Sequence, residues 1–494
     1  MHRCTLVSNK EQFSVTLRYI DEQFEAHEEF VGLYHVQDIS ADTLHRTLVD
    51  VLRRFSLNMA NCRGQCYYDG AANMAGARNG VAARISNEEP RAVYSHCYGH
   101  ALNLAVSDVF KGIPVLRDML DTAFELTKLI KLSPKRETSF EKLQVELDHK
   151  NSVKISAFSY TRWTVRRQAL KNILLNYTVL MQLWEECLEQ RLDSDIKARI
   201  NGVMAQMEKF SFLFSVFLAE LVFQHTDNLS TALQAKNVSA CEGQELARLV
   251  IKTLEGLRNE ESFELMWSKC TQFAHENGVE EPALPRKRRA PKRFQVGSGE
   301  PHHHSDPKTY FRVQYFEALD ASITCIQDRF NTEGYSTLKN LEELLIKAAA
   351  GEEWMKQLDE VTSFYQNDLK KDVLAAQLHS FKLLFEDDPT APTVHTVKEK
   401  IKKFSCGQRV LFNEVCTLLK LLICIPATNA TSERSFSAMR RLKHYLRGSM
   451  GQQRLNNVMI LHVHKDKTDL LNLKKVANEF VKGKPQRLNY FKRF

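Results

Sequence analysis

Two carboxylates, Asp69 and Glu433, are placed where a phosphodiester-cleaving site could use them. Glu433 lies in the segment Ala427-Thr-Asn-Ala-Thr-Ser-Glu433-Arg-Ser-Phe-Ser437, which follows Pro426 and offers several side chains that can cap a new helix. A carboxylate in a first helical turn complements the helix dipole, so Glu433 is either a capping residue or a metal ligand. The residues alone leave both interpretations open.

Asp69 follows a short strand predicted around Gln65–Tyr68 and precedes Gly-Ala-Ala-Asn-Met-Ala-Gly76. A carboxylate just past a strand end lies where ligands bind in α/β sheets. An Asp before small residues is also an ordinary helix N-cap, and the residues alone favour that role.

The elements that would position these carboxylates follow from the periodicity of apolar residues. Alternation over 13–19 predicts a half-buried strand, and the apolar run 30–36 predicts its hairpin partner. A helix follows, capped by Ser40, with its apolar stripe formed by Leu44, Leu48, Val51, Leu52 and Phe55. After the strand at 65–68, a helix is expected to run to about Ile85. The order strand, strand, helix, strand, helix predicts an α/β core.

Between Trp163 and Pro426 the periodicity becomes helical. Apolar residues at three- and four-residue spacing occupy 164–191, 195–225, 240–275, 309–330 and 336–349. One strong apolar face comprises Met204, Met207, Phe210, Leu213, Phe214 and Phe217, and it is expected to pack against neighbouring helices.

Four sequence blocks resemble the hAT superfamily of transposases. The block that contains Glu433, continuing to Ser449 and through Gln452-Gln-Arg-Leu-Asn-Asn457, resembles the superfamily's C-terminal signature, as found in domesticated zinc-finger MYM-type transposase-like proteins. Cys66-Tyr-Tyr-Asp69-Gly-Ala-Ala-Asn is similar to the block around the second catalytic Asp. Ser95-His-Cys97-Tyr-Gly-His100-Ala-Leu-Asn and Arg162-Trp163 resemble the Cys-x-x-His-x-Leu-Asn and Arg-Trp blocks.

This resemblance implies an RNase H-like core interrupted by a large all-helical insertion. The implied domains are 1–163 and 406–494 for the core, the latter with the dimerisation region, and 164–405 for the insertion. Asp69 and Glu433 become two members of an Asp-Asp-Glu triad and the ligands of Mg²⁺ or Mn²⁺ if the protein is active. Arg162 and Trp163 are expected to contact DNA, since the matching Trp holds a flipped base in active relatives. Arg434, Arg440 and Arg441 are further candidates for phosphate contacts.

The first triad member is missing at its expected place. It would fall within Met1–Val7, which contains no Asp or Glu, so the core is expected to lack its first strand. Two-metal cleavage needs ligands that hold both cations, so transposition chemistry is expected to be lost and no cofactor is required. The relatives' N-terminal zinc finger is likewise not found. The same absence would arise if the coding sequence extends upstream of Met1.

Two further clusters each have a structural interpretation besides a functional one. Cys97 and His100 supply half of a four-ligand zinc site, so we expect them to pack near the active face. The loop 278–308 is expected to be exposed, and its basic run can act as a nuclear localisation signal, bind phosphate or simply be solvated. That run consists of Arg286, Lys287, Arg288, Arg289, Lys292 and Arg293. A solvated loop explains the run His302–His304 better than a metal site does.

Composition excludes several classes of protein. The 494 residues are 43% hydrophobic and 26% charged, as in globular proteins, and no apolar run approaches the ~18 residues of a membrane span. Eleven scattered cysteines suit reduced thiols rather than a disulfide framework. The net charge of +8 is modest for this length.

Three functions remain after these exclusions. The leading one is a domesticated, catalytically inactive transposase-derived protein of the nucleus, which forms a homodimer through its C-terminal region and binds DNA or chromatin. The second is an active metal-dependent nuclease or transposase that uses Asp69, Glu433 and a third ligand. The third is a helical protein-interaction scaffold without DNA binding.

Overall fold

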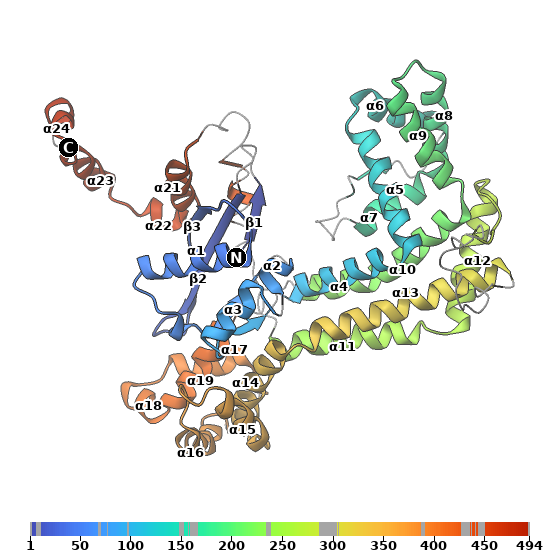
Figure 1. Ribbon diagram of the computed structural model, residues 1–494. Coiled ribbons are helices and arrows are strands. Elements are labelled where there is room, and N and C mark those ends of the chain that lie inside the picture. The colour runs from blue at the N-terminus through green and yellow to red at the C-terminus, as the bar shows by residue number, and fades with distance from the viewer. Residues whose placement is uncertain are drawn as a thin grey trace, which may run out of the picture. The chain divides into compact units, whose positions relative to one another are not determined.

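The computed structural model describes two compact units, one formed by Met1–Cys97 with Glu333–Phe494 and the other by Tyr98–Thr332 (Figure 1). The described residues are 2–5 (backbone only), 11–67, 71–76, 78–95, 98–147, 153–156, 158, 166–233, 239–285, 304, 306–386, 391–425, 435, 437–439, 441–442 and 450–492. These residues are mostly helical, and the strands among them all belong to the first unit. Strands and helices thus combine in the first unit, as the α/β prediction for the core expects, while the chain as a whole is mostly helical.

An antiparallel sheet in the order β1-β2-β3 begins the first unit. It comprises β1 (His2–Thr5), β2 (Glu11–Ile20) and β3 (Ala26–His35). The predicted hairpin is confirmed, and Asp21 closes its turn by accepting the backbone N–H groups of Gln23 and Glu25. The expectation of a missing first strand is wrong, because β1 pairs with β2 from His2↔Ser14 to Thr5↔Glu11.

Helices on one face of this sheet follow the predicted order. They are α1 (Ala41–Arg54), α2 (Ala72–Ala75) and α3 (Val81–Glu88), with η1 (Met59–Asn61) after α1 and the parallel pair β4 (Gly64–Cys66) and β5 (Val93–Ser95). Ser40 caps α1 as predicted, but Phe55 is 52% exposed rather than part of the buried stripe.

The single helix expected up to Ile85 is broken into α2 and α3. Gly76 and Gly80 cause the break: a Cβ on Gly76 would lie 2.2 Å from the Ala72 carbonyl oxygen, and one on Gly80 would lie 2.6 Å from the Gly76 nitrogen. Only glycine fits backbone this close.

The two faces of the β2–β3 hairpin support different cores. Phe13 and Val15 face the cluster that contains Leu48 of α1 and Ile85 of α3. On the opposite face, β3 supplies Phe30 and Leu33 to a second cluster. Its other buried members are Ala438, Met439, Leu455 and Met459, the last two from α21 (Gln452–Val463). The sheet is thus covered by N-terminal helices on one side and C-terminal residues on the other (Figure 1).

The rest of the first unit is helical. It contains α14 (Glu333–Ala350), α15 (Met355–Phe364), α16 (Lys371–Phe381), η4 (Lys382–Leu384), α17 (Val394–Lys402), α18 (Cys406–Leu411) and α19 (Asn413–Cys424). After α21 come α22 (Lys465–Asp469), α23 (Leu473–Lys482) and α24 (Pro485–Phe491). Gly334 lets α14 approach β5 closely, because a Cβ there would lie 1.9 Å from the Tyr94 carbonyl oxygen.

The second unit consists of helices in its described residues. These are α4 (Tyr98–Gly112), α5 (Pro114–Lys131), α6 (Pro134–Glu146), α7 (Arg166–Leu175), α8 (Tyr177–Glu189), α9 (Ser194–Met207), α10 (Phe210–Leu233), α11 (Ala240–Gly256), α12 (Glu260–Glu276) and α13 (Pro307–Phe330). The helical ranges predicted at 164–191, 195–225 and 240–275 each form two helices, whereas 309–330 and 336–349 fall within single helices, α13 and α14.

Helix α10 is the central helix of this unit. Its Phe210 and Phe214 rings pack on Phe311, with centroids 5.1 and 4.7 Å away, and on Trp267. The expected packing of this apolar face against neighbouring helices is therefore confirmed. No single helix in the described ranges is long and apolar enough to cross a membrane; α9 and α10 meet that test only as a pair bent by 73°.

Candidate functional site

The two predicted carboxylates, Asp69 and Glu433, lie outside the described residues, but their chain neighbours do not. Strand β4 leads to Asp69 through the fully buried Tyr67, whose hydroxyl donates to the Gln65 side chain at 2.6 Å. Ile425 precedes the segment of Glu433, and Ser435 follows it; both are buried. The geometry of the site can therefore be examined from its flanks.

The described residues on either side of the Glu433 segment contact strands of the first unit. The Ser435 hydroxyl lies 3.3 Å from the Ser14 hydroxyl of β2. A Cβ on Gly64 of β4 would lie 3.2 Å from Ile425 Cγ1, so this strand and Ile425 are in close contact. Arg18 of β2 donates from Nη2 to the Ile423 carbonyl at 2.8 Å. The chain on both sides of Glu433 is thus fixed to the strands, one of which leads to Asp69.

Side chains of the C-terminal segment also bind the free edge of β3. Asn456 of α21 accepts the Leu33 backbone N–H and donates to the Leu33 carbonyl, both at 2.8 Å. Gln452 donates to the same carbonyl at 2.8 Å and to the Gln12 side chain at 2.9 Å. The His464 ring lies 3.0 Å from the Phe30 carbonyl oxygen. Backbone groups that an edge strand would leave unpaired are thereby satisfied.

A group of charges joins β4 and β5 to the helical part of the same unit. Arg63 forms two hydrogen bonds to Asp368, at 2.7 and 2.9 Å, and Arg91 reaches the same carboxylate at 3.1 Å. Arg91 also forms a two-point pair with the buried Glu89 at 2.7 Å, and this hydrogen bonding holds the pKa of Glu89 below its ordinary value. These carboxylates are structural, since arginines already pair with them.

In the second unit, the predicted Cys-x-x-His-x-Leu-Asn block lies at the start of α4. His100 is on this helix and is half-buried; Cys97 is outside the described residues. Further along α4, the Ser107 hydroxyl lies 3.5 Å from the guanidinium of Arg166, which is buried at the start of α7. Arg162 and Trp163 are not described, but Arg166, at the start of the helix that follows them, contacts α4 through this hydroxyl.

Asp227 and its neighbours are candidates that the sequence analysis missed. Asp227 of α10 lines a small cavity of about 10 Å³ with Asn103 of α4. Burial raises the pKa of Asp227 to about 6, although Arg167 and Arg166 oppose this shift. Burial and Arg167 also lower the pKa of His225. The available signal was the pair His225 and Asp227 within a helix whose residues are mostly apolar, because perturbed titratable groups gather at functional sites.

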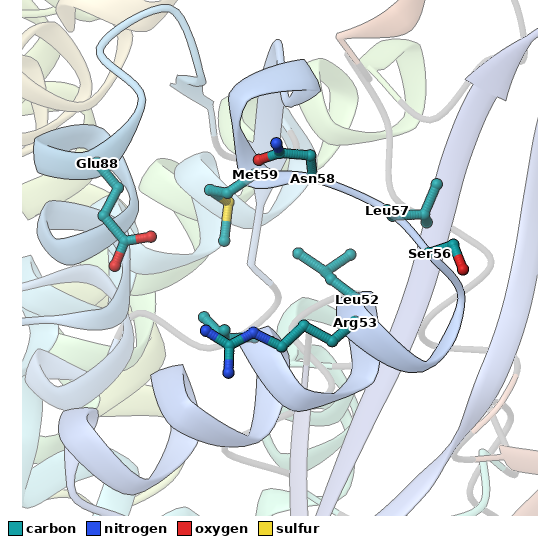
Figure 2. A pocket seen from close by; sticks show the side chains of 8 residues that line it. Leu52, Arg53, Ser56, Leu57, Asn58, Met59 and Glu88 are labelled. Carbon is teal, nitrogen blue, oxygen red and sulfur yellow. The ribbon is translucent and has the colours of Figure 1, made fainter.

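An open hollow of about 480 Å³ lies at the C-terminal end of α1. It is lined by Val49, Leu52, Arg53, Ser56, Leu57, Asn58, Met59 and Glu88. Figure 2 shows the Met59 and Leu52 side chains bordering it, together with the charged ends of Arg53 and Glu88. The lining contains one carboxylate, Glu88, and one hydroxyl, Ser56, which lie on opposite sides of the hollow in Figure 2, so it provides no catalytic set.

Among the remaining predicted residues, the structure describes Arg441 but not the others. Arg441 is exposed, and its Nε donates weakly to the Ser437 carbonyl at 3.4 Å. Arg434, Arg440 and the basic run 286–293 lie outside the described residues. Within the described ranges, no three His, Cys, Asp or Glu side chains lie close enough to hold a metal ion. The catalytic role of Asp69 and Glu433 therefore stays a prediction.

Comparison with known proteins identifies two regions of the chain. Residues 1–80 match the family of the ZMYM1/FAM200 RNase-like domain, and residues 391–466 match the hAT family C-terminal dimerisation region. The chain is a hAT transposase-like protein. The matched dimerisation region contains α17 to α19 and α21, including the side chains that bind β3.

Two curated relatives match nearly the whole chain. The "52 kDa repressor of the inhibitor of the protein kinase" of Mus musculus is 26% identical over 491 residues, covering 93% of this chain and 61% of that protein. The protein of the same name from Homo sapiens is 25% identical over 490 residues, covering 93% of this chain and 60% of its own length. The hAT transposase-like chain thus spans about three fifths of the length of the curated relatives it matches.

The edge contact predicts a specific effect of Asn456→Asp. A carboxylate can still accept the Leu33 N–H, but its second oxygen then faces the Leu33 carbonyl without a proton to donate. We expect the first unit to lose about 1–3 kcal/mol of stability, measured by urea unfolding, with faster hydrogen exchange at the Leu33 amide. Asn457→Asp is the matched control, since Asn457 is exposed on the same helix. Equal losses in both variants would contradict the contact.

The perturbed carboxylate of Asp227 predicts a pH-dependent gain of stability in Asp227→Asn. The folded-state pKa of about 6 lies above the ordinary value of 3.8, so the carboxylate destabilises the fold progressively as pH rises from 3.8 to 6 and fully above that. At pH 7 we expect Asp227→Asn to be roughly 1–2 kcal/mol more stable than the native chain, with the gain vanishing near pH 3.5. The exposed Asp118→Asn is the control, and thermal unfolding across this pH range is the measurement. A gain independent of pH would disprove the assignment.

Proposed function

We propose that this hAT transposase-like protein is a domesticated, catalytically inactive derivative that acts as a homodimer in the nucleus and binds DNA or chromatin. Its dimerisation region carries the proposal, because residues 391–466 match this region of the hAT family and are built into the first unit through β3. The curated relatives are named as repressors, which fits a nuclear regulatory role.

The architecture that we propose is an RNase H-like core interrupted by a helical insertion. The first unit is assembled from both ends of the chain, and the second unit is helical in its described residues and lies between them in sequence. An antiparallel β1-β2-β3 sheet followed by α1 and the parallel pair β4-β5 agrees with such a core. The proposed domains of the family architecture stay 1–163, 164–405 and 406–494, and their bounds differ from those of the two compact units, which divide at Cys97/Tyr98 and Thr332/Glu333.

The surface that we propose for self-association is the part of the dimerisation region that its own unit leaves exposed. Met439, Leu455 and Met459 are buried against β3, so they belong to the core of their own unit. Two pairs of large apolar side chains in the matched region remain on the surface. They are Ile460 (38% exposed) with Leu461 (49%) on α21, and Val410 (77%) with Leu411 (61%) on α18. Exposed apolar pairs of this kind favour contact with another protein surface.

The catalytic part of the proposal depends on the ligand set. Strand β1, the partner of β2 ahead of the hairpin, has the sequence His-Arg-Cys-Thr and carries no carboxylate. A two-metal site needs more than Asp69 and Glu433 to hold both cations. The alternative, an active nuclease, is supported by the contacts of Ile425 with β4 and of Ser435 with β2, which place the described residues on both sides of the Glu433 segment against the strands.

DNA and chromatin binding is proposed from charge. The basic run 286–293 and Arg162, Arg434, Arg440 and Arg441 offer cations for phosphates, and Trp163 offers a stacking face. The same run is the proposed nuclear localisation signal.

Self-association predicts that the purified chain is dimeric and that the double variant Ile460→Ser with Leu461→Ser raises the dissociation constant about tenfold or more. Both side chains are exposed in the monomer, so their loss should not unfold α21. Sedimentation velocity over a concentration series is the measurement. Leu249→Ser with Leu265→Ser, at 51% and 60% exposure in the second unit, is the matched control. A monomeric native chain would reject the homodimer.

Catalytic inactivity predicts no Mn²⁺-dependent nicking of supercoiled plasmid DNA above the level of Asp69→Asn and Glu433→Gln variants. The physical reason is the incomplete ligand set for two cations. All three proteins should be purified identically, and gel mobility of the plasmid is the readout. Nicking by the native chain that both variants lose would establish a third ligand and the active nuclease instead.

A further inference from the structure

The chain continues past the matched dimerisation region into a segment with almost no core of its own. Residues 465–492 form α22, α23 and α24, and Val481 is the one buried side chain among them. Helices α23 and α24 contact each other: the Phe480 and Phe491 ring centroids are 6.5 Å apart, and the Arg487 guanidinium lies 4.0 Å from the Phe480 ring centroid. Helices this short are not stable in water without packing, so the segment needs a partner surface.

An apolar stripe on α23 indicates that the partner surface is apolar. Leu473, Val476 and Phe480 recur at intervals of three and four residues, the spacing of a helix–helix seam, and they are 78%, 48% and 53% exposed. Leu470, at 86% exposure, precedes this stripe, and Leu488, at 40%, follows it on α24. Contiguous exposed apolar residues of this extent mark an interaction site.

We propose that this C-terminal arm, Leu470–Phe491, pairs with the same arm of a second copy of the chain. The proposal rests on the self-association proposed above and adds a second contact outside the matched region. Continuity supports the second copy as the occupant: α21, with its exposed Ile460 and Leu461, leads through α22 directly into the arm. A homodimer formed by residues 391–466 would hold two identical arms at high effective concentration, and one apolar stripe is self-complementary about a two-fold axis.

Charge gives this pairing a distinctive salt dependence. Residues 465–492 contain eight Lys and Arg but three Asp and Glu, a net charge of +5 within a chain of net +8. Lys474, Lys475 and Lys482 lie on the polar side of α23, so paired arms repel each other. Burying an exposed Leu or Phe contributes more than a screened surface charge pair costs, so the arms pair despite this repulsion. Added salt screens the repulsion and strengthens the pairing, whereas salt weakens binding to DNA or to an acidic protein.

The test is sedimentation velocity of the full chain at about 0.05 and 0.5 M NaCl. The stripe variant combines Leu473→Ser with Phe480→Ser and removes no buried side chain. The matched control combines Lys474→Ser with Lys475→Ser on the same helix. We expect tighter association of the native chain at high salt. The stripe variant should show an approximately tenfold higher dissociation constant and no strengthening by salt. The lysine variant should associate at least as tightly as the native chain at low salt.

Three other outcomes overturn the proposal, each in a recognisable way. If the stripe variant associates like the native chain while the Ile460 and Leu461 variant does not, the arm proposal fails and self-association stands. If the native chain stays monomeric, both fail. If added salt weakens association of the native chain, and the lysine variant associates more weakly than the native chain, the arm binds an acidic surface instead of a second arm.

Discussion

The first unit depends on the closure of one sheet edge. Strand β3 is the edge of the antiparallel sheet. The outward N–H and C=O groups of Leu33 form hydrogen bonds with the side chain of Asn456, more than four hundred residues later in the chain. An unpaired edge is both a loss of hydrogen bonds and a template for aggregation. Because the atoms that satisfy it come from α21, the N-terminal hairpin and the C-terminal helices form one folding unit despite their separation in sequence.

This long-range closure explains why the dimerisation region has two faces with different tasks. Leu455 and Met459 face β3 and complete its core, while Ile460 and Leu461, the next residues along α21, are left at the surface. The helix is therefore held rigidly by one side and exposed on the other. Because α21 is already ordered within the monomer, little conformational entropy of this helix is lost when a partner binds its exposed side. This favours association.

Local patterns in the sequence predicted local structure well. The alternation over 13–19 and the Ser40 cap determine elements through neighbouring residues, so the hairpin and α1 were predictable. The break between α2 and α3 was missed because it depends on how close Gly76 comes to the Ala72 carbonyl, a distance that no pattern encodes. The raised pKa of Asp227 was missed for a related reason: it depends on which helices pack around this side chain.

The first unit is held together, among its described residues, by contacts that link its N-terminal strands to segments far along the chain. They are the Ser14–Ser435 contact, the Arg18 bond to Ile423, the Asn456 contacts with Leu33, and the charges around Asp368. None of these needs a metal ion or a carboxylate at position 69 or 433 to form. The described contacts close the sheet edge and leave the α21 surface exposed without any carboxylate in β1, whose sequence is His-Arg-Cys-Thr. In the inactive derivative proposed above, self-association would therefore depend on contacts that do not require the first triad member.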